Sequence, residues 1–131
     1  VCLGYAQKRE DLNLGDDNHG VLRTGDIARV DADGFYYITG RLKRFVKIWG
    51  NRCNLDQLEQ IVKTITISCA CVGVDDCVTI FTTQDGVEQE IKSLLSAKTG
   101  LNTRAFQVIK LDKIPTTLSG KLDYSAMQKM I

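Results

Sequence analysis

Residues 69–83 read CACVGVDDCVTIFTT, and this stretch decides the fold. It holds two segments rich in small and β-branched residues, Cys69–Val74 and Cys77–Thr83, joined at Asp75-Asp76. Such segments on either side of a turn signal are typical of a β-hairpin. A further strand is predicted at Phe106–Leu111. Together with the helices predicted around them, these strands indicate an α+β domain with a three-stranded sheet packed by helices.

Helix signals surround the hairpin. After Asn54, which suits an N-cap and has Gln57 three residues on, apolar residues recur at helical spacing. A second helix is predicted to begin near Asp85, with Glu88 completing a capping box, and to end at Gly100. A short third helix is predicted from about Asp123.

The first 40 residues have a different character. Glycines divide them into short segments, and Asp33-Gly34 precedes the aromatic and β-branched run Phe35–Thr39. An Asp-Gly pair before such a run is a strong hairpin signal. Another strand is predicted at Phe45–Trp49. We therefore expect a small β-hairpin unit in front of the compact domain.

Composition excludes several classes of protein. The 131 residues are 44% apolar and 25% charged, with a net charge of +1, which is typical of a soluble globular protein. The charge gives no reason to expect a nucleic acid or an acidic membrane as partner. The sequence has no apolar run of the ~18 residues that span a bilayer and no signal pattern, so we expect a cytoplasmic location. It begins at Val1 in what resembles the middle of a folded segment, so we expect a piece of a longer protein.

Cysteine usage favours buried thiols. Five cysteines are an odd number, which rules out a complete set of disulfides within the chain. The Cys69-x-Cys71 pair allows a metal reading, but it lies in an apolar stretch far from the only histidine, His19. We expect no metal site.

Three features can carry chemistry. Lys121 follows a flexible glycine in a polar loop, where a lysine can reach a phosphate or carboxylate but is more often simply solvated. Asp26 ends a tight Thr-Gly-Asp turn, where it can accept hydrogen bonds from a ribose diol or stabilise its own turn. The basic run from Arg41 to Lys47 suits an anion or nucleotide surface and, equally, a solvated strand edge.

Five segments carry a resemblance when they are taken in order. They are Leu22-Arg23-Thr24-Gly25-Asp26, Asp33-Gly34-Phe35, Gly40-Arg41-Leu42-Lys43, Lys47-Ile48-x-Gly50-x-Arg52 and Pro115-x-x-x-Ser119-Gly120-Lys121. In identity, order and approximate spacing they resemble the core motifs of the adenylate-forming superfamily, which includes acyl-CoA synthetases, luciferases and peptide-synthetase adenylation domains. The sequence departs from the family at Gln57, where glutamate is common.

The resemblance implies roles for single residues. Asp26 resembles the aspartate that holds the ribose hydroxyls of ATP, and Arg41 the arginine beside it. Lys121 resembles the lysine that bridges the carboxylate substrate and the α-phosphate. Lys43 stands at the family's hinge. The stretch Lys47–Arg52, with Gly50, would face the pantetheine arm of the thiol acceptor.

The resemblance also implies a division of the chain and a function. Residues 1–41 would be the tail of the large amino-terminal domain, most of which lies outside this sequence, and residues 42–131 the mobile carboxy-terminal lid. The whole protein would join a small carboxylic acid to coenzyme A or to the phosphopantetheine of a carrier protein, using ATP and Mg²⁺ and forming AMP. We expect this piece to be inactive alone.

Two alternatives stay open. One is a binding or regulatory module that keeps the lid fold without catalysis. The other is a nucleic-acid binder that uses Arg41 to Lys47.

Overall fold

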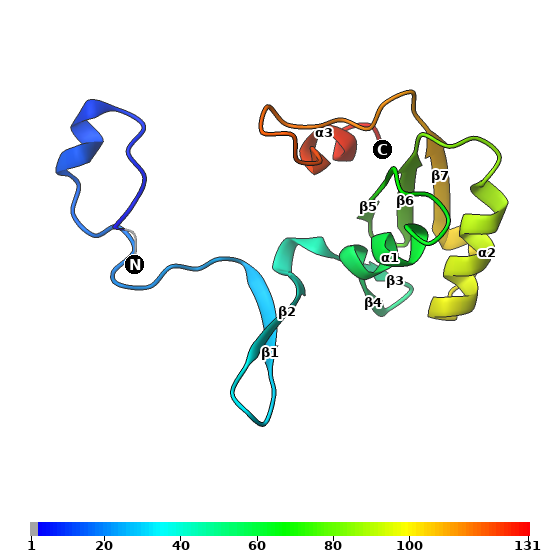
Figure 1. Cartoon of the computed structure of the whole chain (residues 1–131), viewed down its shortest axis with the longest axis horizontal. Coiled ribbons are helices and arrows are strands. Elements are labelled where there is room, and N and C mark those ends of the chain that lie inside the picture. Colours follow the sequence, from blue (N-terminus) through cyan, green and yellow to red (C-terminus); the bar gives the residue numbers. More distant parts are fainter. Residues whose placement is uncertain (1–2) are drawn as a thin grey trace.

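A three-stranded sheet forms the centre of the folded domain (Figure 1). The computed structural model describes residues 3–131, so Cys2 lies outside it. Strand β5 (Cys69–Val74) pairs antiparallel with β6 (Cys77–Thr82), and β7 (Phe106–Lys110) pairs parallel with β6. The predicted hairpin, the third strand and the α+β class are confirmed.

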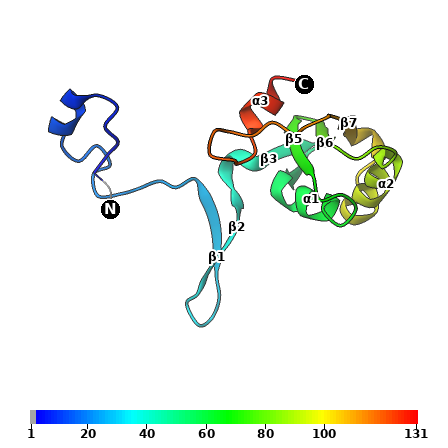
Figure 2. The same ribbon diagram turned by 45° about the horizontal axis from the view of Figure 1, so that its top comes forward.

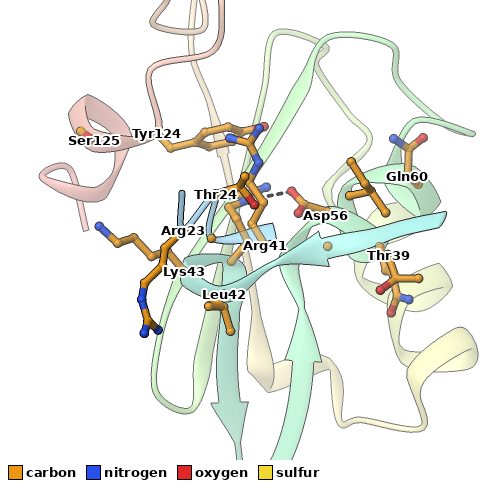
Figure 3. Close-up of a pocket in the computed structure, with 15 residues that line it drawn as sticks. Arg23, Thr24, Thr39, Arg41, Leu42, Lys43, Asp56, Gln60, Tyr124 and Ser125 are labelled. Carbon is orange, nitrogen blue, oxygen red and sulfur yellow. Dashed lines mark hydrogen bonds and ion pairs between the residues drawn. The ribbon is translucent and has the colours of Figure 1, made fainter. Parts of the chain in front are cut away.

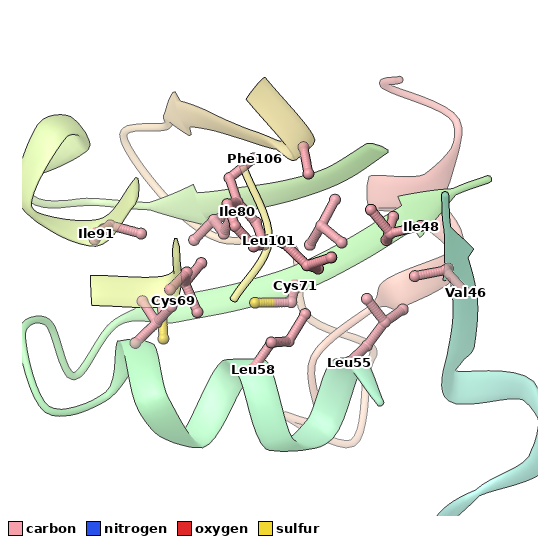
Figure 4. Packing of buried hydrophobic residues seen from close by; sticks show 14 of the residues in the cluster. Val46, Ile48, Leu55, Leu58, Cys69, Cys71, Ile80, Ile91, Leu101 and Phe106 are labelled. Atoms are coloured by element: carbon pink, nitrogen blue, oxygen red, sulfur yellow. The ribbon is translucent and has the colours of Figure 1, made fainter. Parts of the chain in front are cut away.

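Helices cover both faces of this sheet (Figure 2). Helices α1 (Leu55–Val62) and α2 (Glu88–Thr99) pack on one face, and the short α3 (Tyr124–Gln128) packs on the other. Because alternate residues of a strand point to opposite faces, Cys69 and Cys71 join the first core cluster and Ala70 and Val72 the second. Figure 4 shows the first cluster, with the side chains of α1 directed toward the sheet.

The helix starts follow local chemistry in two cases of three. Asn54 Oδ1 accepts the amide of Asp56 at 2.9 Å, and Asp123 caps α3 in the same way through Ala126. The predicted start of α2 near Asp85 is wrong, because α2 begins at Glu88. The Asp85 carboxylate pairs instead with Lys110 Nζ at 2.6 Å, which removes it from the position of a cap.

Two hairpins precede the sheet. Strands β1 (Asp26–Val30) and β2 (Tyr36–Arg41) form a ribbon that projects away from the domain in Figure 1. After the 3-10 turn η2 (Leu42–Arg44), β3 (Phe45–Ile48) pairs with β4 (Asn51–Asn54), a strand that the sequence did not predict. Two further 3-10 turns are η1 (Arg9–Asn13) and η3 (Thr103–Ala105).

The two parts of the chain differ in burial. Between residues 3 and 39 every residue is at least partly exposed, and Gly40 is the first buried residue in the described range. Hydrophobic burial therefore holds residues 44–131 together, while the ribbon is supported mainly by its own backbone pairing. Among the described residues, none of the helices has the length and apolar content required to cross a membrane.

Candidate functional site

A cleft of about 970 Å³ lies where the β1–β2 ribbon meets the folded domain (Figure 3). One wall comes from residues 23–25 and 38–41, the floor from η2, and the other wall from α1 and the start of α3. Its lining is rich in groups that bind anions or sugar hydroxyls: Arg23, Thr24, Arg41, Lys43, Asp56, Gln57, Gln60, Tyr124 and Ser125.

Asp26 and Arg41 form an ion pair at the ribbon wall. They are register partners at the end of the ribbon, and Arg41 Nε lies 3.1 Å from Asp26 Oδ1. The Arg41 side chain is 71% exposed and the Asp26 side chain 25%, so the pair adds at most about 1 kcal/mol to stability. It places an anionic acceptor beside a cationic donor, and of the two residues only Arg41 lines the cleft. The structure thus brings together two residues that the sequence had assigned to one nucleotide.

Lys43 lies in η2, between the ribbon and the domain, and lines the cleft. Its side chain is exposed. The backbone amide of Leu42, just before it, donates to the Gly25 carbonyl at 2.8 Å. The only covalent path from β2 to β3 runs through this three-residue turn, so rotation here would reorient the domain against the ribbon.

Arg44 does not belong to a solvated basic edge. It is buried, and its guanidinium donates to Asp56 at 2.7 Å, to the Cys71 carbonyl at 2.6 Å and to Glu59 at 3.1 Å. Glu59 is buried on the apolar face of α1, where an unpaired carboxylate would be unfavourable, and Arg44 pairs with it. Of the basic run, therefore, only Arg41, Lys43 and Lys47 present charge to solvent.

Tyr124 closes this buried cluster from the side of α3. Its ring lies 3.8 Å from the Arg44 guanidinium carbon, and its hydroxyl donates to Glu59 Oε2 at 3.1 Å and Oε1 at 3.2 Å. Burial, together with the negative charge of Glu59, raises the pKa of Tyr124 to about 12. The phenol is therefore a proton donor in this cluster at neutral pH.

Lys121 lies in a tight loop just before α3 and is not among the residues that line the cleft. Thr116 and Leu122 form an isolated bridge, and the Thr117 amide donates to the Lys121 carbonyl at 2.7 Å. Gly120 has φ +77°, which a residue with a side chain rarely adopts. The loop thus holds an exposed ammonium group on a closed backbone frame.

The stretch Lys47–Arg52 forms the turn end of the β3–β4 hairpin, and none of its residues lines the cleft. Its two turn residues, Trp49 (φ +47°) and Gly50 (φ +85°), both have positive φ, as in a type I′ hairpin turn. A tryptophan in this conformation is unusual. The Trp49 amide donates to Asp76 Oδ1 at 2.6 Å, so the β5–β6 turn supports the strained residue.

Metal binding gains no support from the described cysteines. Cys53, Cys69, Cys71 and Cys77 are free thiols, and residues 3–131 contain no group of three or more potential ligands from His, Cys, Asp and Glu. Burial raises the pKa of Cys71 well above its ordinary value, and that of Cys69 to about 11 with a further contribution from Glu59. Protonated, buried thiols are poor metal ligands.

Sequence reasoning missed Glu59 and Tyr124. A signal for Glu59 was present, because Leu55, Leu58, Glu59 and Val62 follow the i, i+3, i+4, i+7 pattern of a buried helix face. A carboxylate in that pattern implies a buried partner. For Tyr124, three residues beyond Lys121, no local signal stood out.

Comparison with known sequences finds AMP-forming ligases and synthetases. No family model matches the chain. A 4-coumarate–CoA ligase-like protein of Arabidopsis thaliana is 30% identical over 93% of this chain and 24% of its own length. A 4-coumarate–CoA ligase of Petroselinum crispum is 33% identical over the same shares. A plipastatin synthase from Bacillus subtilis is 30% identical over 85% of this chain and 3% of its own length. The chain spans about a quarter of the length of the coumarate ligases that it matches.

Solved structures of other proteins share the fold of this chain. MatB from Rhodopseudomonas palustris, solved with ATP bound, superposes with a TM-score of 0.66 at 22% identity, over 82% of this chain and 24% of that protein. The amide bond synthetase McbA from Marinactinospora thermotolerans gives a TM-score of 0.62 at 21% identity, over 84% of this chain and 25% of that protein. At these identities the likeness establishes the fold alone.

Proposed function

We propose, from the premise that this chain belongs to the adenylate-forming superfamily and corresponds to its carboxy-terminal part, that it completes an ATP-dependent, AMP-forming carboxylic acid:thiol ligase. In the first half-reaction a carboxylate oxygen attacks the α-phosphorus of ATP and pyrophosphate leaves. In the second, a thiolate attacks the acyl carbon and AMP leaves. The relatives named above motivate the reaction class.

The Asp26–Arg41 pair is the observation that carries the proposal. Two carboxylate oxygens can accept both hydroxyls of a ribose, and the guanidinium beside them can contact the same nucleotide. The two side chains lie 3.1 Å apart and come from two separate motifs. Arg41 also lines the cleft of about 970 Å³, a volume within the range of ligand pockets.

The distribution of apolar side chains supports the division of the chain at residues 41 and 42. Within the described residues, eleven of the eighteen large exposed hydrophobic side chains lie between Leu3 and Ile38. A free-standing segment gains little from so much exposed apolar surface, and such surface usually marks an interface. We assign residues 1–41 to the tail of a large amino-terminal domain and residues 42–131 to a lid that moves against it.

Lys121 supplies charge during adenylation in this scheme. Carboxylate and triphosphate are both anionic, and their approach concentrates negative charge between them. An ammonium group on an exposed loop can offset that charge at the moment it builds up. Mg²⁺ would enter with ATP as part of the substrate.

Lys43 is the proposed pivot between the two half-reactions. Turning the lid at η2 would withdraw the Lys121 loop from the adenylate and bring the Lys47–Arg52 hairpin toward it. Gly50, with no side chain, lets a narrow pantetheine arm pass close to the backbone. The acceptor would be coenzyme A or the phosphopantetheine of a carrier protein.

The described cysteines are free thiols, which suits a cytoplasmic location.

Two variants test the scheme. Both are made in the longer ligase, which we define as the proposed protein that contains this chain as its carboxy-terminal part. Lys121→Ala should lower acid-dependent pyrophosphate exchange on the order of 10²-fold or more while thioester formation from supplied acyl-adenylate stays near wild type. Lys43→Pro should do the reverse, because proline fixes φ at the pivot. Lys113→Ala, which removes another exposed lysine shortly before the loop, is the matched control and should leave both rates unchanged.

Equal loss of both half-reactions in Lys121→Ala would contradict the role of this lysine. Normal rates for both in Lys43→Pro would contradict the pivot. If the unmodified protein exchanges no pyrophosphate with any carboxylic acid, the chain is better explained as a non-catalytic binding module.

A further inference from the structure

A partly buried charged cluster joins the pivot to the Lys121 loop. It contains two cations, Arg44 and Lys63, and two anions, Asp56 and Glu59, linked by contacts of 2.7 to 3.2 Å. Glu59 is 5% exposed, and its carboxylate is contacted by four donors. These are the side chains of Arg44 and Lys63, the Cys71 amide at 3.1 Å and the Tyr124 hydroxyl. Its charge and lone pairs are thus used within the fold, and the cluster as a whole is neutral.

The two ends of this cluster, Arg44 and Tyr124, lie next to the pivot and the Lys121 loop. Arg44 follows Lys43 directly, and Tyr124 follows Lys121 by three residues. The distance along the chain between Arg44 and Tyr124 is 80 residues, yet the guanidinium carbon lies 3.8 Å from the centre of the Tyr124 ring. Glu59 contacts both, so a single carboxylate ties the residue after the pivot to a residue just after the loop.

The loop itself transmits this anchoring to Lys121. The Asp123 amide donates to the Pro115 carbonyl at 2.9 Å, and the Gly120 amide donates to the Thr117 carbonyl at 2.9 Å. The Thr117 hydroxyl also accepts the Lys121 amide at 3.3 Å. With its backbone closed in this way, the loop moves as a unit, and its position depends on where Tyr124 is held.

We propose that Tyr124 is a positioning residue for Lys121, because its hydroxyl bond to Glu59 and its ring contact with Arg44 fix the Thr116–Leu122 loop to the element that turns at the pivot. The proposal rests on the function proposed above for Lys121 and Lys43. Lid rotation then carries Lys121 with it as part of one rigid body. In this scheme Tyr124 acts through Lys121 and not on a reacting atom.

Stability alone gives a weak reason for this cluster. A buried ion pair costs desolvation free energy, and well-packed apolar residues often replace such pairs without loss of stability. What the directional bonds of the cluster do provide is a single geometry between α1, η2 and α3. That geometry matters for a lysine whose ammonium group must meet two substrates, since a displacement of about 1 Å can cost on the order of 10²-fold in rate.

The first test uses this chain and measures the loop directly. Tyr124→Phe keeps the ring on Arg44 and removes only the bond to Glu59. Amide hydrogen exchange of residues 117–123 should become at least about fivefold faster, while the exchange of β5 and β6 stays unchanged. Glu59→Gln, which keeps the volume and weakens the same bond, should act in the same direction if its fold is retained.

Gln128→Ala is the matched control. It removes another hydrogen bond of α3, from Gln128 Nε2 to the Gly73 carbonyl at 3.1 Å, which does not involve Glu59. The loop should keep its wild-type exchange in this variant. Faster loop exchange in Gln128→Ala equal to that in Tyr124→Phe would overturn the proposal, because any loosening of α3 would then suffice.

The second test uses the longer ligase. Tyr124→Phe should lower kcat for pyrophosphate exchange on the order of 10-fold, leave KM for ATP within about twofold, and spare thioester formation from supplied acyl-adenylate. Wild-type exchange kinetics in a variant with a loosened loop would overturn the positioning role while leaving Lys121 in place. An unmodified ligase without pyrophosphate exchange would instead overturn the proposed function, and with it this role.

Discussion

Gly40 lies against Asn54 so closely that a Cβ atom on Gly40 would stand 2.6 Å from Asn54 Nδ2. The same Asn54 side chain donates to the Thr39 carbonyl at 3.0 Å and caps α1 through the Asp56 amide at 2.9 Å. One amide group thus fastens the ribbon to the domain and begins a helix. Its position leaves room for no side chain on β2 at this point.

Gly40→Ala should therefore destabilise the chain by about 1–2 kcal/mol, the range for loss of a helix cap. The methyl group would displace Asn54, and both of its hydrogen bonds would be lost. Urea unfolding measures the change. Gly15→Ala is the control, because nothing lies within 4 Å of a Cβ atom there. Combining Gly40→Ala with Asn54→Ala should add little, and full additivity would contradict this explanation.

The Asp76 carboxylate should control the conformation of Trp49. Asp76 itself has φ +67°, a region that asparagine tolerates and alanine does not. Asp76→Asn keeps both the backbone conformation and an oxygen for the Trp49 amide, whereas Asp76→Ala loses both. Trp49 is the chain's one tryptophan and is 52% exposed, so its fluorescence reports on this turn. We expect a changed emission and anisotropy in Asp76→Ala only, and identical spectra for the two variants would contradict the role.

Alkaline pH should weaken the fold through Tyr124. Burial, then Glu59, raises the pKa of Tyr124 to about 12 from 10.0, so the folded chain keeps the phenol proton to higher pH than the unfolded chain does. The stabilising contribution is complete below about pH 10 and is lost as pH rises through about 12. The free energy of unfolding should fall across this window.

Tyr124→Phe isolates that effect. Lys110, whose pKa is raised by its hydrogen bond to Asp85, also loses its contribution at alkaline pH. The slope also contains the thiols of Cys69 and Cys71, whose pKa burial raises. The wild-type slope therefore sums several groups, and the phenylalanine variant should show a shallower slope between about pH 10 and 12. Equal slopes for wild type and variant would mean that Tyr124 titrates alike in the folded and unfolded chains.

The buried thiols of Cys69 and Cys71 should resist alkylation in the folded chain. Burial raises the pKa of Cys71 well above its ordinary value and that of Cys69 to about 11, so neither thiol is ionised near neutral pH. Iodoacetamide should leave both unmodified in the native chain and label both in urea, as peptide mass spectrometry would show. Native labelling of Cys71 at the denatured rate would contradict its position at the centre of the sheet.

Local chemistry predicted the regular elements well. The β-branched runs of β5 and β6, the cap at Asn54 and the stop at Gly100 each depend on residues that are near one another in sequence. The start of α2 failed because Lys110, 25 residues beyond Asp85, took the carboxylate that should have capped the helix. Strand β4 was missed because Asn51–Asn54 has no apolar alternation, and its pairing follows from the turn at Trp49 and Gly50.

The candidate site was likewise predicted only in part. Resemblance placed Asp26 beside Arg41, and the structure pairs them. The burial of Arg44 could not be predicted, because a run of four basic residues does not reveal which of them pairs with a buried carboxylate. Tyr124 escaped notice because its partners, Arg44 and Glu59, lie 80 and 65 residues away.

The second face of the central sheet is covered by residues that are synthesised late, Ile114 and the α3 residue Met127. The hairpin β5–β6 leaves the ribosome before α3, so Ala70, Val72 and Phe81 on this face stay exposed to water until Ile114 and Met127 can pack on them. A nascent chain stalled before residue 124 would expose this surface to chaperones or to aggregation.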